Sequence, residues 1–409
     1  MSPTRPRIAI IGGNFAGLTA AAALSPRHAV TVIDPSRHLE WVPAIHEILS
    51  SVKTPQALRL DRAAIVRQAG HRFLRDRVTA LQPALGRLQT AGGRDLAFDA
   101  CIVALGAEGN TGRVPGAQRH ALPFRNVDDA QAIERRLKAL WRPGQPLRVV
   151  IAGGGIAGVE AVGELLRQHR DDSRLSVQWV EAGPRLLPGL PASLDADLRR
   201  LCAPYAVTIR TGTGIAAVAA KSVRLADGTR LRSDLTLWSA GLAAPALLRE
   251  AGLATPPQTW AEVLPTLQSR HADNVFVAGD AALLPQPLGK QAYHAIDMGA
   301  LAAANVQRWL EGQALRRFRP APKPVLIAFG DLQTYLVAGR TVVASKLLAG
   351  AKEGIYQWFM AQREPISLVA SLPSAAGRLW TGWQQLAVPQ LLSLAGFRAL
   401  PDCRNLRQT

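Results

Sequence analysis

Two glycine-rich segments, each followed by an acid at the end of the next apolar stretch, are the residues of this sequence best suited to chemistry. The first is Gly12-Gly13-Asn14-Phe15-Ala16-Gly17 with Asp34, and the second is Gly153-Gly154-Gly155-Ile156-Ala157-Gly158 with Glu181. Glycine allows a sharp turn and lets the backbone approach a pyrophosphate, while an acid at this spacing binds ribose hydroxyls. The sequence therefore predicts two dinucleotide sites about 140 residues apart.

Strands and helices must position both segments. We expect strands over 8–11 and 30–33 with a helix over 18–24 around the first segment, and strands over 149–152 and 177–180 with a helix reaching residue 166 around the second. In such a unit the helix N-terminus points at the phosphates. Asn14 replaces the usual second glycine, and we attribute this to the tolerance of asparagine for unusual backbone angles.

The same alternation of apolar strands and Ala-rich helices continues through the first 310 residues, and a Pro-rich stretch, 319–324, then separates a different C-terminal part. This pattern is typical of α/β proteins with parallel sheets. We predict two Rossmann-like (three-layer ββα) dinucleotide-binding domains with a smaller C-terminal α+β domain.

Two further strands that end in small residues point to a flavin in the first unit. They cover 99–106 and 274–280. Asp280, at the end of the second, is placed to bind the ribityl chain of a flavin. A turn or helix-cap role is the alternative for this residue.

These motifs, with Trp41-Val42-Pro43, Leu237-Trp238-Ser239-Ala240-Gly241 and Gly289-Lys290-Gln291-Ala292-Tyr293-His294, resemble the two-dinucleotide flavoprotein reductases of the pyridine nucleotide-disulfide oxidoreductase fold. Within them, the chain is similar to the type II NADH dehydrogenases and the ferroptosis-suppressor-type NAD(P)H:quinone oxidoreductases. The resemblance covers about residues 7–363, and the segments 290–305 and 326–365 look more like the second group.

The resemblance implies FAD bound by residues 1–112 and 268–312, NAD(P)H bound by 113–267, and a C-terminal domain over 313–409. A quinone would accept the electrons. The implied cofactor-binding residues are Gly12, Gly13, Asn14, Phe15, Ala16, Gly17, Asp34, Pro43, His46, Val78, Ala104, Gly106, Gly153, Gly155, Ile156, Ala157, Gly158, Glu181, Gly241, Gly279, Asp280, Gln291 and Ala292. His46 stands where the family often has an arginine.

Three residues are expected to act in catalysis. Glu160 matches an acid near the nicotinamide and flavin rings, although a Glu in a first helical turn also suits the helix dipole. Lys290 would stabilise the reduced flavin beside a helix that begins near Gln291, and His294 would give a proton to the quinone. The alternative is an exposed lysine and a packed histidine.

Other features narrow the choice of substrate. Glu181 repels a 2′-phosphate and favours NADH, while the nearby Arg185 leaves NADPH open. The three cysteines, Cys101, Cys202 and Cys403, are too scattered for a dithiol centre, and no metal site is expected. A cytoplasmic protein fits these thiols.

The formal charge of +18 is dispersed along the chain, so no nucleic-acid partner is expected. Residues 364–398 carry few charges and several Leu and Trp, broken by Pro373 and Pro389. We predict interfacial helices that contact the cytoplasmic face of the inner membrane, or alternatively a homodimer contact. A reductase for a ferredoxin-like protein and a non-catalytic redox-sensing flavoprotein are the competing functions.

Overall fold

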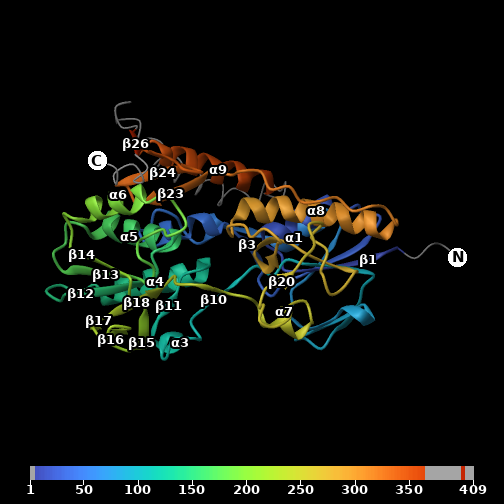
Figure 1. Cartoon of the computed structure of the whole chain (residues 1–409), viewed down its shortest axis with the longest axis horizontal. Coiled ribbons are helices and arrows are strands. Elements are labelled where there is room, and N and C mark those ends of the chain that lie inside the picture. Colours follow the sequence, from blue (N-terminus) through green and yellow to red (C-terminus); the bar gives the residue numbers. More distant parts are fainter. Residues whose placement is uncertain (1–4, 364–397, 401–409) are drawn as a thin grey trace.

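Two parallel sheets carry the two glycine-rich turns in the computed structural model, which describes residues 5–363 and 398–400. Figure 1 shows the two units side by side, with the helices of the last third of the chain lying over both. This arrangement confirms the predicted α/β class with two Rossmann-like domains.

The first unit is built on a five-stranded sheet of order β21-β9-β1-β2-β5. Its strands are β1 (Arg7–Ile11), β2 (Ala29–Ile33), β5 (Arg72–Leu74), β9 (Ala100–Val103) and β21 (Val275–Val277). Its main helices are α1 (Phe15–Ala23), α2 (Arg62–Gln68) and α8 (Ala292–Leu310). An antiparallel sheet adds β6 (Val78–Gln82), β7 (Arg87–Thr90) and β8 (Asp95–Ala97). The strand β21 returns to this sheet from late in the chain, so residues on both sides of the second unit form the first one.

The second unit repeats this plan with the order β11-β18-β12-β13-β14. Its strands are β11 (Leu122–Pro123), β12 (Leu147–Ala152), β13 (Leu175–Glu181), β14 (Val207–Thr211) and β18 (Leu235–Trp238). Its helices are α3 (Ala117–His120), α4 (Val127–Leu140), α5 (Ile156–His169) and α6 (Ser193–Cys202). The antiparallel strands β15 (Ile215–Ala219), β16 (Ser222–Leu225) and β17 (Arg230–Arg232) complete it.

Short elements connect and close the two units. The strands β10 (Glu108–Gly109) and β19 (Leu242–Ala243) pair where the chain crosses between the units. The other short pieces are β3 (His38–Glu40), η1 (Val42–Ile48), η2 (Gln56–Leu58), β4 (Arg59–Asp61), η3 (Pro83–Leu85), α7 (Ala246–Glu250), β20 (Ala261–Glu262), η4 (Gly279–Ala281) and β22 (Ala282–Leu283).

The C-terminal part follows the Pro-rich stretch 319–324. It consists of β23 (Val325–Phe329), β24 (Gln333–Ala338), β25 (Thr341–Ala344), α9 (Leu348–Arg363) and β26 (Arg398–Leu400). The strand β23 packs on α5, and in Figure 1 α9 lies above it along the top of the molecule. None of the helices in the described ranges is long and apolar enough to cross a membrane.

Two glycines allow backbone atoms of neighbouring segments to approach the helices that follow the two turns, α1 and α5. A Cβ on Gly299 of α8 would lie less than 3.0 Å from the carbonyl of Ala16 on α1. A Cβ on Gly163 of α5 would come equally close to the backbone of Phe329 and Gly330. Since backbone atoms cannot give way as a side chain can, only glycine fits at these contacts.

Candidate functional site

The first glycine-rich turn needs glycine for two reasons. Gly12 has φ +97, and a Cβ there would lie less than 3.0 Å from the carbonyl oxygen of Ala104 at the end of β9. A Cβ on Gly17 would collide in the same way with the carbonyl oxygen of Gly12. The turn is therefore pressed between strand and helix, and residues 12–16 line the cavity described below.

The second turn repeats this geometry at matching positions. Gly153 has φ +109, and a Cβ on Gly158 would lie less than 3.0 Å from the carbonyl oxygen of Gly153. The two turns are thus the same backbone device used twice, as the sequence predicts. Each forms the cradle that a pyrophosphate needs.

The two acids each fold back onto their own turn. Asp34 accepts hydrogen bonds from the Gly13 amide at 2.8 Å and from Arg62 Nη1 at 2.5 Å. Glu181 accepts from the amides of Gly154 at 2.6 Å and Gly183 at 2.7 Å. Asp34 also accepts from the Ser36 amide at 2.8 Å. A carboxylate has about four acceptor positions, so both acids keep capacity for a ribose hydroxyl, Glu181 more than Asp34. The residues present therefore fit two dinucleotides.

Asn14 does not adopt the left-handed backbone conformation that favours glycine. Its φ is −106, and helix α1 begins directly after it, at Phe15 rather than at 18. The corresponding Gly155 has φ −74, so neither position requires glycine. Asn14 Oδ1 instead accepts a 3.4 Å hydrogen bond from the Glu40 amide.

One cavity of about 1350 Å³ runs from the first turn, past α5, to the C-terminal sheet. Its walls come from both nucleotide units and from β23, β24 and α9. It brings together most of the predicted site residues: Gly12, Gly13, Asn14, Phe15, Ala16, Asp34, Pro43, Val78, Ala104, Gly106, Ile156, Ala157, Glu160, Gly241, Gly279, Asp280, Lys290, Gln291 and Ala292.

The remaining predicted residues lie outside this lining. Gly17, Gly153, Gly155, Gly158 and Glu181 belong to the turns and their acids, whereas His46 is buried behind the wall with 1% of its surface exposed. His294 lines a small pocket that adjoins the cavity, and its Nδ1 is buried without a hydrogen-bond partner among the described residues. Lys290 lines both spaces, so it shares the small pocket with His294, which does not line the cavity.

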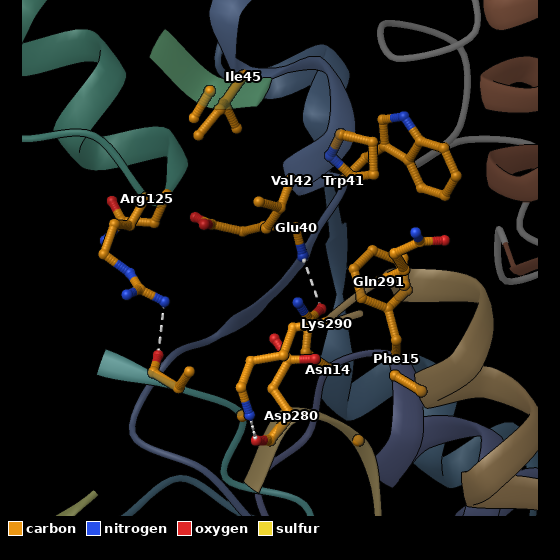
Figure 2. Close-up of a pocket in the computed structure, with 18 of the residues that line it drawn as sticks. Asn14, Phe15, Glu40, Trp41, Val42, Ile45, Arg125, Asp280, Lys290 and Gln291 are labelled. Carbon is orange, nitrogen blue, oxygen red and sulfur yellow. Dashed lines mark hydrogen bonds between the residues drawn. The ribbon is translucent and has the colours of Figure 1, made fainter. Parts of the chain in front are cut away.

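Lys290 and Asp280 meet in one wall of the cavity (Figure 2). Lys290 Nζ donates to the Asp280 carbonyl oxygen and lies 3.4 Å from the centre of the Trp260 ring. Burial lowers the pKa of the Lys290 ammonium and raises the pKa of the Asp280 carboxyl. The Trp260 ring and the Asp280 carbonyl thus hold the Lys290 ammonium in place beside the cavity.

Arg125 is a cavity residue that the sequence did not reveal. Its Nη2 donates to the Ala107 carbonyl at 2.6 Å, and Nη1 is buried without a partner among the residues described (Figure 2). Burial lowers the pKa of this guanidinium, and Asp280 opposes that effect. It lies between β11 and α4 at the join of the two units, in a segment with no recognisable motif.

Glu160 is paired with a lysine from the far end of the chain. Lys352 Nζ on α9 donates to Glu160 Oε1 and lies 3.3 Å from His46 Nε2. His46 Nδ1 is 3.3 Å from Glu160 Oε2 but out of hydrogen-bond alignment. Burial raises the pKa of Glu160, which Lys352 opposes, while burial and then Lys352 hold the pKa of His46 well below its usual value.

Sequence reasoning missed Lys352 and Arg62. Lys352 and Glu353 are the only charged residues of α9 before its last position, Arg363, and this adjacent pair is the local signal for a buried polar cluster there. Arg62 follows Asp61, the residue that caps α2, and so looked like an ordinary first-turn arginine.

Three other predictions concern residues that do not line the cavity. Arg185 donates to the carbonyls of Leu187 and Pro188 at 2.9 and 2.8 Å, so its guanidinium is turned toward its own loop. Cys101 and Cys202 are buried free thiols, and burial raises the pKa of Cys202 to about 12. The predicted interfacial segment 364–398 lies outside the described residues except for the backbone of its last position.

This chain is similar in sequence and in fold to several known proteins. The sequence model described as "Pyridine nucleotide-disulphide oxidoreductase" matches residues 6–299. The demethylphylloquinone reductase NdbB of Synechocystis is 27% identical over 350 residues, which cover 81% of this chain and 86% of that protein. The type II NADH:quinone oxidoreductase of Haemophilus influenzae is 26% identical over 381 residues, covering 79% and 85%. The structure of NDH2 from Plasmodium falciparum in complex with NADH superposes with a TM-score of 0.81 at 14% identity, over 95% of this chain and 99% of that one.

Proposed function

The chain belongs to the pyridine nucleotide-disulphide oxidoreductase family, and we propose that it is an FAD-dependent enzyme that oxidises NADH and reduces a quinone. FAD, when bound, supplies the two-electron relay between the two substrates. The relatives with similar sequences are named as reductases of quinones or of demethylphylloquinone, which supports the choice of acceptor.

The single observation that carries this proposal is the continuous cavity. It joins the first turn, with Asp34 and Asp280, to the start of α5 and to the C-terminal sheet. A hydride can move only when donor and acceptor rings are held in contact, which requires sites that open on one space. Its volume of about 1350 Å³ exceeds the roughly 300–1,000 Å³ of a typical ligand pocket, which leaves room for more than one ligand.

The residues divide the work along this cavity. The first turn and Asp34 would hold the adenosine and phosphates of FAD, and Asp280 its ribityl chain. The second turn and Glu181 would hold NADH, with Arg185 engaged by its own loop. Glu160 and Lys352 would face the reacting rings, where a carboxyl and an ammonium can orient a carbonyl and exchange a proton.

We propose that the quinone enters where the cavity meets the C-terminal part. Here the lining is mostly apolar and includes Val325, Leu326, Leu336 and Leu348. Such a surface suits an isoprenoid quinone that arrives from a lipid phase, so a peripheral contact with a membrane is part of the proposal. Truncation after Glu364 should move the protein from membrane to supernatant, and an unchanged distribution would contradict the contact. Conversion of a dimer to a monomer on truncation would instead support a homodimer contact.

Stopped-flow mixing tests the central claim. The purified protein should be yellow. NADH should bleach the flavin absorbance at a rate at least equal to kcat, and ubiquinone or menaquinone analogues should restore that absorbance. A colourless protein, or a flavin that NADH leaves oxidised, would overturn the proposal. Rapid reoxidation by a ferredoxin but by no quinone would redirect it to a protein acceptor.

A further inference from the structure

A buried cluster of charges surrounds Glu160 where η1, α5 and α9 meet. Lys53 Nζ lies 2.5 Å from Glu353 Oε2 and 3.3 Å from Glu47 Oε2. One helical turn after Glu160, Glu164 Oε2 accepts a hydrogen bond from Ser50 Oγ, and its Oε1 is 3.6 Å from Arg167 Nη1. Several of these groups line the cavity: Glu47, Glu160, Glu164, Arg167, Lys352 and Glu353.

The buried carboxyls of this cluster do not all have a lysine ammonium in direct contact. Its carboxyls are Glu47, Glu160, Glu164 and Glu353, and its cations are Lys53, Arg167 and Lys352. His46 adds no charge because burial keeps its pKa far below neutrality. An unpaired buried carboxylate is unfavourable, so one carboxyl of the cluster should keep its proton.

Glu164 is the carboxyl best suited to keep that proton. Glu160 and Glu353 each have a lysine ammonium in direct contact, whereas Glu164 has only Arg167 at 3.6 Å. Glu164 is 1% exposed, and burial raises its pKa to about 7. The Ser50 hydroxyl can donate to the ionised form or accept from the protonated one, so it suits both states.

Reduction of a quinone by NADH requires one proton more than NADH supplies. NADH gives up a hydride, which carries two electrons and one proton, while a quinone gains two electrons and two protons. We propose that Glu164 stores this additional proton and passes it by way of Glu160 to the quinone oxygen. The O–H bond of Glu164 breaks, a new O–H bond forms on the quinone, and solvent water returns a proton to Glu164 beside Arg167, whose side chain is 26% exposed.

This inference rests on the proposed function, and Glu164 acts through Glu160 rather than on the substrate. Charged and titratable groups reach Glu164 from every element around it. Glu47 and Ser50 come from η1 and the turn after it, Glu160 and Arg167 from α5 itself, and Lys352 from α9. On the outer side, Ser51 donates to Glu134 of α4 at 3.3 Å, and Lys138 pairs with Glu134.

The test is the pH dependence of flavin reoxidation by quinone in the holoenzyme, measured between about pH 5.5 and 8.5 by stopped flow. The wild-type rate should fall as pH rises through about 7, where the cluster loses its proton. Glu164→Gln should be slower by about tenfold at acid pH, nearly independent of pH, and equal to the wild type at the alkaline end. Glu164→Asp should restore a pH-dependent rate, and the control Glu134→Gln should follow the wild-type profile.

A ratio of wild-type to Glu164→Gln rates that is the same at every pH would overturn the proposal, since a structural role predicts that result. Infrared spectroscopy gives a second readout that does not depend on turnover. The band of a protonated carboxyl should titrate near neutral pH and be missing in Glu164→Gln, and its persistence in the variant would also overturn the proposal. If no quinone reoxidises the wild-type flavin, the proposed function fails, and the infrared titration still decides whether Glu164 holds the proton.

Discussion

The helices that follow the two glycine-rich turns begin from the same backbone geometry and carry opposite kinds of side chain. Helix α1 has no charged residue, and it packs against α8 through the close approach of Ala16 and Gly299. Helix α5 buries both Glu160 and Glu164, which face Lys352 of α9 and Arg167 of α5 itself. We interpret the first unit as a holder for a retained cofactor and the second as the unit that faces the reacting groups.

The acids of the two units, Asp34 and Glu181, also differ in how their charges are balanced. Asp34 is paired with the buried Arg62, which also donates to the Ser36 carbonyl, so its charge is neutralised inside the protein. Glu181 accepts hydrogen bonds from two backbone amides, and no cation of residues 5–363 pairs with it. A neutralised acid suits permanent binding, while an acid that keeps its full charge discriminates between nucleotides that arrive and leave.

Substitution of the last glycine of each turn should have the largest effect, and the property that is lost should differ between the two units. In both Gly17→Ala and Gly158→Ala the new Cβ would lie less than 3.0 Å from a carbonyl oxygen of the same turn, which costs roughly 1–3 kcal/mol or more. Gly17→Ala should lose its flavin, measured as the ratio of flavin to protein absorbance. Gly158→Ala should keep the flavin and raise KM for NADH by about tenfold or more.

The matched control is Gly189→Ala in a loop of the second unit, because a Cβ at that position meets nothing within 4 Å and Gly189 does not line the cavity. It should change neither the flavin content nor KM for NADH. Flavin loss from Gly158→Ala as complete as that from Gly17→Ala would contradict the division between the two units.

The buried carboxyl of α5 should give a pH-dependent stability that α1 cannot give. The pKa of Glu164 rises from 4.5 in the unfolded chain to about 7 in the folded protein. The folded state therefore holds the proton more tightly, and its stability should fall as pH rises from about 4.5 to 7, by at most roughly 3 kcal/mol. Urea unfolding of the wild type and Glu164→Gln at several pH values measures the difference, which should grow in favour of the variant as pH rises.

Glu134→Gln on α4 serves as the control for this experiment and should run parallel to the wild type. Other carboxyls of the cluster titrate too, so only the difference between the curves is assigned to Glu164. Parallel curves for the wild type and Glu164→Gln would show that Glu164 has an ordinary pKa in the folded protein.

The sequence predicted what is local and missed what folding brings together. The turns, their acids and the helix that begins after Gln291 depend on neighbouring residues, and all three lie as the pattern indicates. The partners of Glu160 lie 114 positions before it and 192 after it in the chain, at His46 and Lys352. No local pattern records such a pairing, since it depends on how α9 is laid over η1 and α5. The small pocket of His294 was hidden for the same reason.

The choice between NADH and NADPH tests the unpaired acid of the second unit. Glu181→Gln removes the charge that repels a 2′-phosphate and weakens the acceptor for the ribose hydroxyls. KM for NADH should rise by about tenfold, and the preference for NADH over NADPH, as the ratio of kcat/KM values, should fall by more than that.

The control for this change is Arg185→Gln, because the Arg185 guanidinium is bound to carbonyls of its own loop. Its ratio of kcat/KM values should stay within about twofold of the wild type. Increased discrimination against NADPH in Arg185→Gln would mean that this arginine turns to the nucleotide, contrary to the structure.

The smallest effect should come from exchanging the residues that differ between the turns themselves, Asn14→Gly and Gly155→Asn. Neither position has a positive φ, so the exchange forces no strained backbone. Asn14→Gly loses the 3.4 Å hydrogen bond from the Glu40 amide and increases the conformational entropy of the unfolded chain. The free energy of unfolding, measured in urea, should therefore fall by about 0.5–1 kcal/mol. Gly155→Asn should stay within about 0.5 kcal/mol of the wild type because its Cβ would enter open space. Both variants should remain yellow, which would mean that the acids and helices, and not the turns, make the two units differ in how they bind a cofactor. Loss of flavin from Asn14→Gly alone would instead assign that difference to the turn.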